Sequence, residues 1–358
     1  MKRIVSALLI IAMLCCMTGC GSKKPSTSTT KAPTTTAAST ITTTTPATTT
    51  TVAGKLNPLT GENDMIGSSN RPVAVMITNE PGIIGDQYGI DKADFYMETE
   101  AEGSVPRIMA VFASADRVPE KLGPIRSART PFIATANALG AVYVYSGATT
   151  YVNDILKKTT ALDKITNTDN TTLWRDDYLT ANANKSWNNL ITGGKQLAER
   201  MAKSGISDKA VRRVPFTFGE KSGSITANTI QLKSTASTNV TFIYDEATGL
   251  YGKNNGKAGS CKPQKALGGD QIKVSNVLIL HAEKYVENKN NKYTWYNFRE
   301  GKGTGYLVSN GTARPITFSR TASSLAIYEE DGSTAIFAEG KTYMFLTDKE
   351  LAADLSFS

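Results

Sequence analysis

The stretch Arg71-Pro-Val-Ala-Val-Met-Ile-Thr78 decides how this chain folds. Its middle is an uninterrupted run of apolar residues, and the turn residues Asn79-Glu-Pro-Gly82 follow directly. A short apolar run that ends in such a cluster is typical of a strand buried in a sheet. The sequence therefore predicts a buried strand here, with the other elements of the first half around it.

Strands and helices alternate after this strand. Segments that are rich in Val and Tyr, or that alternate between apolar and polar residues, indicate strands. Segments with apolar residues at helical spacing indicate helices. Strands are predicted at residues 95–102, 107–114 and 141–146, and helices at residues 128–139, 151–158 and 195–203. Residues 55–217 are thus expected to form a layered, mixed α/β N-terminal domain.

The second half shows a different pattern, with short strands separated by turns. The strands are predicted at residues 240–244, 275–282, 292–298, 306–309, 324–328, 334–338 and 343–346. The turns include Asp245–Gly249, Asn310-Gly311, Asp331-Gly332 and the run Gly301-Lys-Gly-Thr-Gly305, whose spacing does not fit a phosphate-binding loop. Residues 218–358 are therefore expected to form a mainly antiparallel β C-terminal domain, and the fold class to be α+β.

The N-terminus carries a secretion signal. Lys2 and Arg3 precede the apolar run Ile4–Cys16, and Met17-Thr-Gly-Cys20 follows it. The run is too short to span a bilayer, which needs about 20 helical residues, and suits the core of a signal peptide. The Met-Thr-Gly-Cys ending resembles the cleavage box of bacterial lipoproteins, so residues 1–20 are expected to be a lipoprotein signal with lipid attached to Cys20. The alternatives are an ordinary secretory signal and an uncleaved anchor.

Residues 21–54 have the composition of a linker. Threonine fills 15 of the positions between Thr27 and Thr51, with Pro33 and Pro46 among them. Such a segment cannot bury a core, so we expect it to be disordered. It would tether the folded part, without a transmembrane helix, to the outer, extracytoplasmic face of the cell membrane.

Charge and composition exclude several classes of function. The net charge is +8, but residues 1–54 hold five Lys and Arg and no acid, which leaves +3 for the rest of the chain. This balance does not favour nucleic-acid binding. Outside the signal the chain has one cysteine, Cys261, and one histidine, His281. A disulfide framework, a Cys-rich or three-His metal site and a cofactor are therefore not expected, and Cys261 is expected to be a free thiol.

The densest polar chemistry begins on the predicted strand at residues 95–102. Because side chains alternate along a strand, Glu98, Glu100 and Glu102 are expected on one face. Like charges in such a row repel unless cations lie opposite them. Arg107 comes soon after and is the first candidate.

Two further arginines lie in Gly123-Pro-Ile-Arg-Ser-Ala-Arg129. If a helix begins near Pro124, Arg126 and Arg129 share one of its faces. Three interpretations stay open for the Glu and Arg residues. They form a structural ion-pair network, a pocket in which arginines bind an anionic or sugar-like ligand, or a catalytic pair of carboxylates such as an inverting glycosidase uses.

A second polar cluster consists of Trp174-Arg175-Asp176 with Asn188-Asn189 a little later. An aromatic residue beside Arg and Asp is common where a ligand is contacted. It is equally common at the edge of a structural core. Trp174, Arg175, Asp176 and Asn189 are therefore candidates for ligand contact.

These segments resemble the YerB family of lipoproteins from Gram-positive bacteria, over essentially all of residues 56–346. The resemblance implies an N-terminal and a C-terminal domain of unassigned function in a layered α+β arrangement, and no established reaction. The family pattern has a His-Asn pair where this chain has Asn188-Asn189, and a His near the position of Cys261. The resemblance rests on Asn57–Gly61, Arg71–Met76, Ala93-Asp94, Glu98, Glu102-Gly103, Arg107, Gly123–Arg129, Trp174–Asp176, Tyr244-Asp245 and Thr248-Gly249.

Two hypotheses for the function follow. The first is a membrane-tethered, non-enzymatic module that binds a cell-wall polymer or an envelope protein through Glu98, Glu102, Arg107, Arg126 and Arg129. The alternative is a cell-wall hydrolase or transferase that uses a pair of these glutamates as acid and base. A transporter's solute receptor fits less well, because such receptors usually show two lobes rich in βαβ units and the second half here is dominated by strands.

Overall fold

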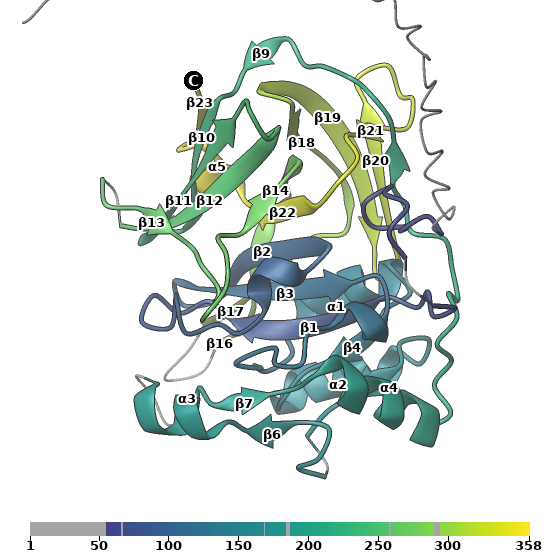
Figure 1. Ribbon diagram of the computed structural model, residues 1–358. Helices are drawn as coiled ribbons and strands as arrows, with labels where there is room; N and C mark the ends of the chain where they lie inside the picture. The colour runs from purple at the N-terminus through teal and green to yellow at the C-terminus, as the bar shows by residue number, and fades with distance from the viewer. Residues whose placement is uncertain (1–54, 66, 168, 184–186, 258, 290–293) are drawn as a thin grey trace, which may run out of the picture. The chain divides into compact units, whose positions relative to one another are not determined.

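A computed structural model describes residues 55–358, apart from 66, 168, 184–186, 258 and 290–293 (Figure 1). The predicted lipoprotein signal at residues 1–20, its lipidation site Cys20 and the predicted linker at residues 21–54 lie outside the described residues. In the described part of the chain, none of the helices has the length and apolar character that crossing a bilayer requires.

Strand β1 (Val73–Thr78) is buried at every position, as the sequence predicts. On one side it pairs antiparallel with β3 (Val105–Phe112), and on the other it pairs in parallel with β4 (Val142–Val144). Beyond β3 lies β2 (Phe95–Glu102), and beyond β4 lies β5 (Lys164–Ile165). The first half of the chain thus forms a mixed sheet.

The second half of the chain continues this sheet. Residues 95–98 of β2 pair in parallel with residues 342–345 of β22. The sheet then runs in the order β22, β15, β18, β19 and β20. The strands added in this way are β15 (Asn276–His281), β18 (Gly301–Ser309), β19 (Thr312–Thr321), β20 (Ser324–Glu329) and β22 (Thr342–Thr347).

A second, antiparallel sheet packs against one face of the central sheet. Phe242 of this sheet lies edge-on to Tyr343 and Phe345 of β22, with ring centroids 5.5 and 6.0 Å away. Helix α4 (Gly194–Lys203) adds Leu197 and Met201 to the same buried layer. The strands of the second sheet are β10 (Thr229–Thr235), β11 (Thr238–Asp245), β12 (Leu250–Gly256), β13 (Lys262–Pro263), β14 (Lys273–Val274) and β23 (Ser356–Phe357).

Helices cover the other face of the central sheet. Phe132 and Ile133 of α1 (Thr130–Ala138) belong to the same core cluster as Met97 and Met109 of the sheet, and α2 (Thr150–Lys158) adds to it. The sheet therefore has a hydrophobic layer on each face, and the chain has the predicted α+β fold. The remaining elements are η1 (Ile90–Lys92), η2 (Ala115–Arg117), β6 (Trp174–Arg175), α3 (Asp177–Asn182), β7 (Leu190–Ile191), β8 (Thr217–Phe218), β9 (Ile225–Thr226), β16 (Lys284–Lys289), β17 (Thr294–Phe298), β21 (Ile336–Phe337) and α5 (Lys349–Ala352).

The prediction that Gly301–Gly305 forms a hairpin turn was wrong. These residues lie within β18 and pair with both β15 and β19. A Cβ atom at Gly305 would lie 2.0 Å from the carbonyl oxygen of Ile279, and one at Gly303 would lie 2.4 Å from the ring of Phe318. The glycines are therefore needed because neighbouring strands and side chains approach the backbone closely.

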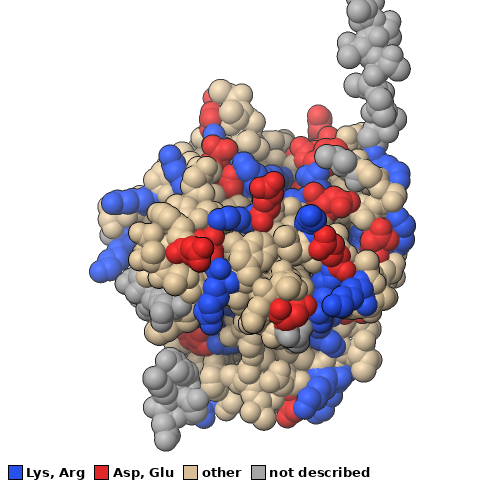
Figure 2. Space-filling view, turned by 60° about the horizontal axis from the view of Figure 1, so that its bottom comes forward, with Lys and Arg blue, Asp and Glu red and all other residues tan. Residues whose placement is uncertain are grey.

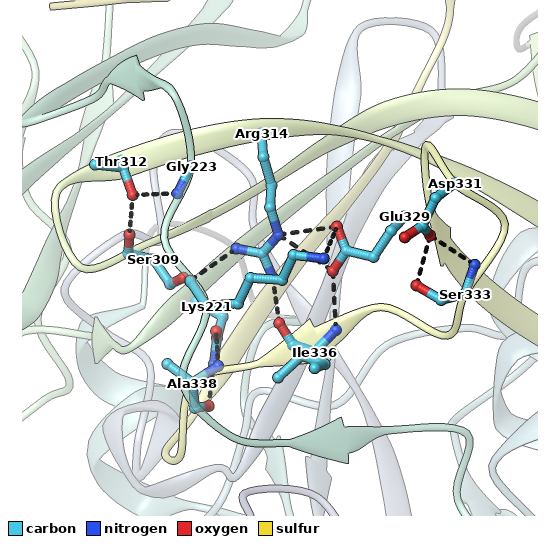
Figure 3. A network of polar contacts seen from close by, with 11 residues as sticks. Lys221, Gly223, Ser309, Thr312, Arg314, Glu329, Asp331, Ser333, Ile336 and Ala338 are labelled. Atoms are coloured by element: carbon cyan, nitrogen blue, oxygen red, sulfur yellow. Dashed lines mark hydrogen bonds and ion pairs between the residues drawn. The ribbon is translucent and has the colours of Figure 1, made fainter.

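A buried polar network holds β19 and β20 to the segment before β9 (Figure 3). The guanidinium of Arg314 donates from Nε to both carboxylate oxygens of Glu329, at 3.3 and 3.2 Å. Its Nη1 donates to the carbonyl oxygen of Lys221 at 3.2 Å, and its Nη2 donates to that of Ile336. Each nitrogen of this buried arginine thus has an acceptor, as a purely structural arginine should.

Candidate functional site

The predicted row of three glutamates on one face of β2 does not form. Glu98 lies opposite Ile108 of β3, but the register shifts between Glu100 and Glu102, so that Glu102 lies opposite Val105. This is a β-bulge, in which an extra residue moves the following side chain to the other face. Glu102 therefore shares its face with Arg107, whereas Glu98 faces the second sheet.

Glu98 is fully buried between the two sheets. Its Oε2 accepts a hydrogen bond from the hydroxyl of Tyr343 at 2.5 Å and lies 3.2 Å from the ammonium of Lys253. Burial lowers the pKa of Lys253, and the charge of Glu98 opposes this effect. Lys253 also donates to Gln264 at 2.6 Å. Since Glu98 and Lys253 are both fully buried, they form a sealed ion pair inside the core.

Glu100 forms a separate contact with the second half of the chain. Its carboxylate lies 2.8 Å from the ammonium of Lys284, which also lies 2.5 Å from the carboxylate of Asp348. The ammonium of Lys284 lies 4.7 Å from the centre of the Tyr296 ring. The three glutamates thus have three different environments. A catalytic pair of Glu98 and Glu102 across one bond is not possible in this arrangement.

Glu102 brings two of the predicted arginines together. Its Oε1 accepts a hydrogen bond from Nη2 of Arg107, and its Oε2 accepts from Nη2 and Nε of Arg129. The indole Nε1 of Trp295 on β17 donates to the same Oε2 at 2.9 Å. Burial acts to raise the pKa of Glu102, but the charges of Arg107 and Arg129 outweigh it and lower this pKa to about 2.

Arg126 approaches the same place from an extended segment. The condition that a helix begins near Pro124 is not met, since α1 begins at Thr130, within the helix predicted at residues 128–139. Residues 122–126 instead lie beside β1, where the Arg126 N–H donates to the carbonyl oxygen of Met76 at 2.9 Å. The Arg126 side chain lies 2.8 Å from Glu80, and its positive charge acts to lower the pKa of Arg107. We define the arginine cluster as Arg107, Arg126 and Arg129 with Glu80 and Glu102.

The arginine cluster holds more positive charge than its carboxylates balance, three cations against two anions. Burial and the neighbouring charge of Arg129 together lower the pKa of Arg107 to about 9, although the charge of Glu102 opposes them. Among the described residues, Nε and Nη1 of Arg107 and Nε of Arg126 have no hydrogen-bond acceptor. The hydroxyl of Thr78, on the strand residue opposite Arg107, has no partner either.

The unpaired donors of Arg107 contrast with the Arg314 network in Figure 3. Both arginines are almost fully buried, and a buried donor without an acceptor costs about 1–3 kcal/mol. All three nitrogens of Arg314 have acceptors, whereas Arg107 has one for Nη2 alone in the described protein. Among the described residues, the arginine cluster therefore has donors without acceptors, which the Arg314 network does not have.

In the cluster at Trp174, Arg175, Asp176 and Asn189, the charged side chains have partners of their own. Arg175 donates to the side-chain oxygen of Asn189 at 2.6 Å. Asp176 caps α3 by accepting from the Leu179 N–H at 2.9 Å. Burial acts to raise the pKa of Asp176, but a hydrogen bond from Lys121 and the Leu179 N–H lower it. These contacts favour a structural role.

Sequence reasoning missed several partners in these sites. Glu80 lies in the turn after β1, and Trp295 lies on the β16–β17 hairpin, far from the arginines in the sequence. Lys253 and Tyr343 lie on β12 and β22. Glu80 had a local signal, because an acidic residue in the turn after a buried strand is a candidate for a site. The others had none, because only the packing of the two halves brings them to β2.

Neither of the two remaining reactive residues joins the arginine cluster. Cys261, the one cysteine among the described residues, has no disulfide, and its sulfur lies 3.5 Å from the carbonyl oxygen of Asn239. His281 ends β15, where burial lowers its pKa.

Comparison with known proteins shows a family match, a relative and a similar solved structure. Residues 59–207 match the family described as "Protein of unknown function (DUF3048) N-terminal domain", and residues 229–344 match its C-terminal domain. A relative from Bacillus subtilis (strain 168), named "Putative lipoprotein YerB", is 24% identical over 317 residues, which cover 84% of this chain and 88% of the relative. The crystal structure of YerB protein from Bacillus subtilis superimposes with a TM-score of 0.71 at 22% identity, over 84% of this chain and 98% of that one. This likeness shows that the fold is shared.

Proposed function

This chain belongs to the YerB-like family, and from that premise we propose that it is a lipid-anchored protein on the outer face of the cell membrane that binds an anionic ligand of the cell envelope at the arginine cluster. The proposal has two parts, the anchor and the binding site, and each has its own support and its own test.

The anchor is supported by the sequence and by the relative's name. The basic start, the short apolar run and Met17-Thr-Gly-Cys20 have the order of a lipoprotein signal. A cysteine with two or more acyl chains gives stable membrane attachment, because each buried methylene contributes about 0.8 kcal/mol. A Cys20→Ser variant should lose labelling by radioactive palmitate and leave the membrane fraction. Retention of the label in this variant would contradict the anchor.

The binding site is supported by one observation above all. The N–H donors at Nε and Nη1 of Arg107 have no acceptor among the described residues. Arginine is suited to such a role because its planar fork matches carboxylate and phosphate groups. An anion here would balance the third positive charge and fill the open donors in one step. The side chains of Arg126, Arg129 and Glu102 are 18, 9 and 15% exposed, so the cluster lies close to the surface.

The distribution of surface charge fits a defined site better than a broad electrostatic surface. On the face in Figure 2, Lys and Arg side chains are interspersed with Asp and Glu side chains and with uncharged areas. A nucleic-acid-binding surface usually gathers one sign of charge instead. The arginine cluster would thus recognise its ligand by close contact with a few charged groups.

Calorimetry tests the binding part. We would titrate the full-length protein in detergent with muropeptides, which carry carboxylates, and with phosphate-linked wall polymer fragments. The proposal expects saturable binding of at least one of them. It expects an Arg126→Gln variant to bind about tenfold or more weakly, since a charged hydrogen bond contributes about 1.5–3 kcal/mol.

The control is Arg299→Gln, which removes an arginine that is 64% exposed and paired with Glu283 outside the arginine cluster. It should bind as the wild type does. Absence of binding to every envelope ligand, or equal weakening by both variants, would contradict the proposed site.

A further inference from the structure

A cavity of about 490 Å³ lies between the loop after β1 and one end of the second sheet. Pro81 and Ile84 of the loop line one side of it. Thr238 at the start of β11 and Asn255 near the end of β12 line it from the sheet. A volume of this size is ordinary for a small-molecule site.

Two buried polar side chains line this cavity without a partner in the described protein. Asn255 and Thr238 are 4 and 2% exposed. Both side-chain polar atoms of Asn255 and the hydroxyl of Thr238 have no hydrogen-bond partner there. Buried polar groups in native proteins are usually paired, so unpaired ones on residues that line a cavity point to a bound group. An amide offers donors and an acceptor together, which suits a ligand with hydroxyl groups.

The rim of the cavity is positively charged. Lys257, Lys262 and Lys265 line it, and none of the other described residues that line it is acidic. None of the three lysines forms an ion pair with a described residue. A larger cavity of about 630 Å³ shares Lys265 with this one, and Asp91 and Asp270 line that larger cavity. Lys257 and Lys262 line the smaller cavity alone, and their positive charge favours an anionic ligand.

We propose that this cavity binds an anionic sugar, charged by a phosphate or a carboxylate. The lysines would hold the charged group, and Asn255 with Thr238 would hydrogen-bond the hydroxyl groups. The apolar side formed by Pro81, Ile84 and Pro263 would pack against the CH face of the sugar ring. The site uses none of the residues of the arginine cluster, so it does not rest on the binding function proposed above.

Calorimetry on the full-length protein in detergent tests this site with three defined probes: glucose 6-phosphate, glucuronate and neutral glucose. The proposal expects saturable binding of one or both charged sugars, which also tells phosphate from carboxylate. It expects binding of glucose to be at least about tenfold weaker. Equal binding of glucose, or no binding of either charged sugar, would overturn it.

Two variants test whether the charged sugar binds at this cavity. Asn255→Ala should weaken binding of the charged sugar about tenfold, since it removes hydrogen bonds made only to the ligand. Its Tm should not fall, because the side chain has no partner in the described protein. Lys262→Gln should weaken binding severalfold, and more at low salt than at high salt.

The controls separate this site from the others. Lys273→Gln changes a lysine of the larger cavity, and Arg126→Gln changes the arginine cluster. Both should bind the charged sugar as the wild type does. Unchanged binding in Asn255→Ala and Lys262→Gln, or a loss of binding in either control, would place the sugar elsewhere and overturn the proposal.

Discussion

Glu98 and Glu102 lie on one strand, yet their side chains point to opposite faces of the central sheet because a β-bulge separates them. Glu98 forms a sealed ion pair with Lys253 in the core, and Glu102 joins Arg107 and Arg129 near the surface. One row of acids in the sequence thus becomes two sites with different chemistry. The first supports the structure, and the second is the candidate ligand site.

The buried pair of Glu98 and Lys253 should tolerate loss of both charges better than loss of one. A Lys253→Met variant leaves Glu98 charged and unpaired in the core, and should lower the free energy of unfolding by about 3–5 kcal/mol. Urea unfolding followed by tryptophan fluorescence would measure this change.

The double variant Glu98→Gln/Lys253→Met is the matched control. It removes the stranded charge, so it should recover most of the stability that Lys253→Met loses. A double variant no more stable than Lys253→Met would show that the stability does not come from pairing these two charges.

Glu102 should make stability depend on pH in the acid range. Its folded-state pKa of about 2 lies below the unfolded-state value of 4.5, so its ion pairs stabilise the fold fully above about pH 4.5. This contribution is lost as the pH falls from 4.5 towards 2. The stability difference between the wild type and Glu102→Gln should therefore be largest at pH 6 and shrink by roughly 2–3 kcal/mol at pH 2.5.

Urea unfolding of both proteins across this pH range would measure the effect. A difference that stays constant from pH 6 to pH 2.5 would show that the charge of Glu102 does not stabilise the arginine cluster.

Gly305 should not accept a side chain. The Cβ atom of an alanine would lie 2.0 Å from the carbonyl oxygen of Ile279, which is held in the sheet. Gly305→Ala should therefore lower the free energy of unfolding by about 3 kcal/mol or more, or prevent folding. Circular dichroism and urea unfolding would show this.

Gly249→Asn offers a comparison, because Gly249 has a φ of +70° and no atom within 4 Å of the added Cβ. Asparagine tolerates this backbone conformation, so the change should stay within about 1 kcal/mol. Equal stability of the two variants would contradict the close approach at Gly305.

Asp176 should matter for stability and not for binding. Asp176→Ala removes the cap of α3 and the partner of Lys121, and should lower the free energy of unfolding by about 1–2 kcal/mol. Its calorimetric affinity for an envelope ligand should equal that of the wild type. A stable variant with lost binding would assign this residue to the ligand site instead.

Local patterns predicted several of the individual elements. The strand at residues 95–102 has the predicted bounds, and the buried strand of the opening stretch is β1, two residues shorter than predicted at its start. The turns at Asn310-Gly311 and Asp331-Gly332 end strands as predicted, with positive φ at both glycines. Such features depend on nearby residues, which a single sequence displays.

Features that depend on distant residues could not be predicted. The bulge before Glu102 depends on the register with β3, for which the alternation of residues 95–102 gives no signal. Strand β12 has the polar sequence Leu250-Tyr-Gly-Lys-Asn-Asn-Gly256, and Lys253 is buried there only because Glu98 lies opposite it across the two sheets. The parallel pairing of β2 with β22 joins segments from the two halves of the chain.

The central claim is that the arginine cluster binds an anion, and NMR of arginine side chains tests it most directly. We would follow the Nε–H resonances of ¹⁵N-labelled full-length protein in detergent during titration with the envelope ligand that binds in calorimetry. We expect saturable shifts for Arg107 and Arg126, whose Nε donors have no acceptor among the described residues, and none for Arg314, whose Nε donates to Glu329. Unshifted Arg107 and Arg126 resonances at saturation would contradict the claim.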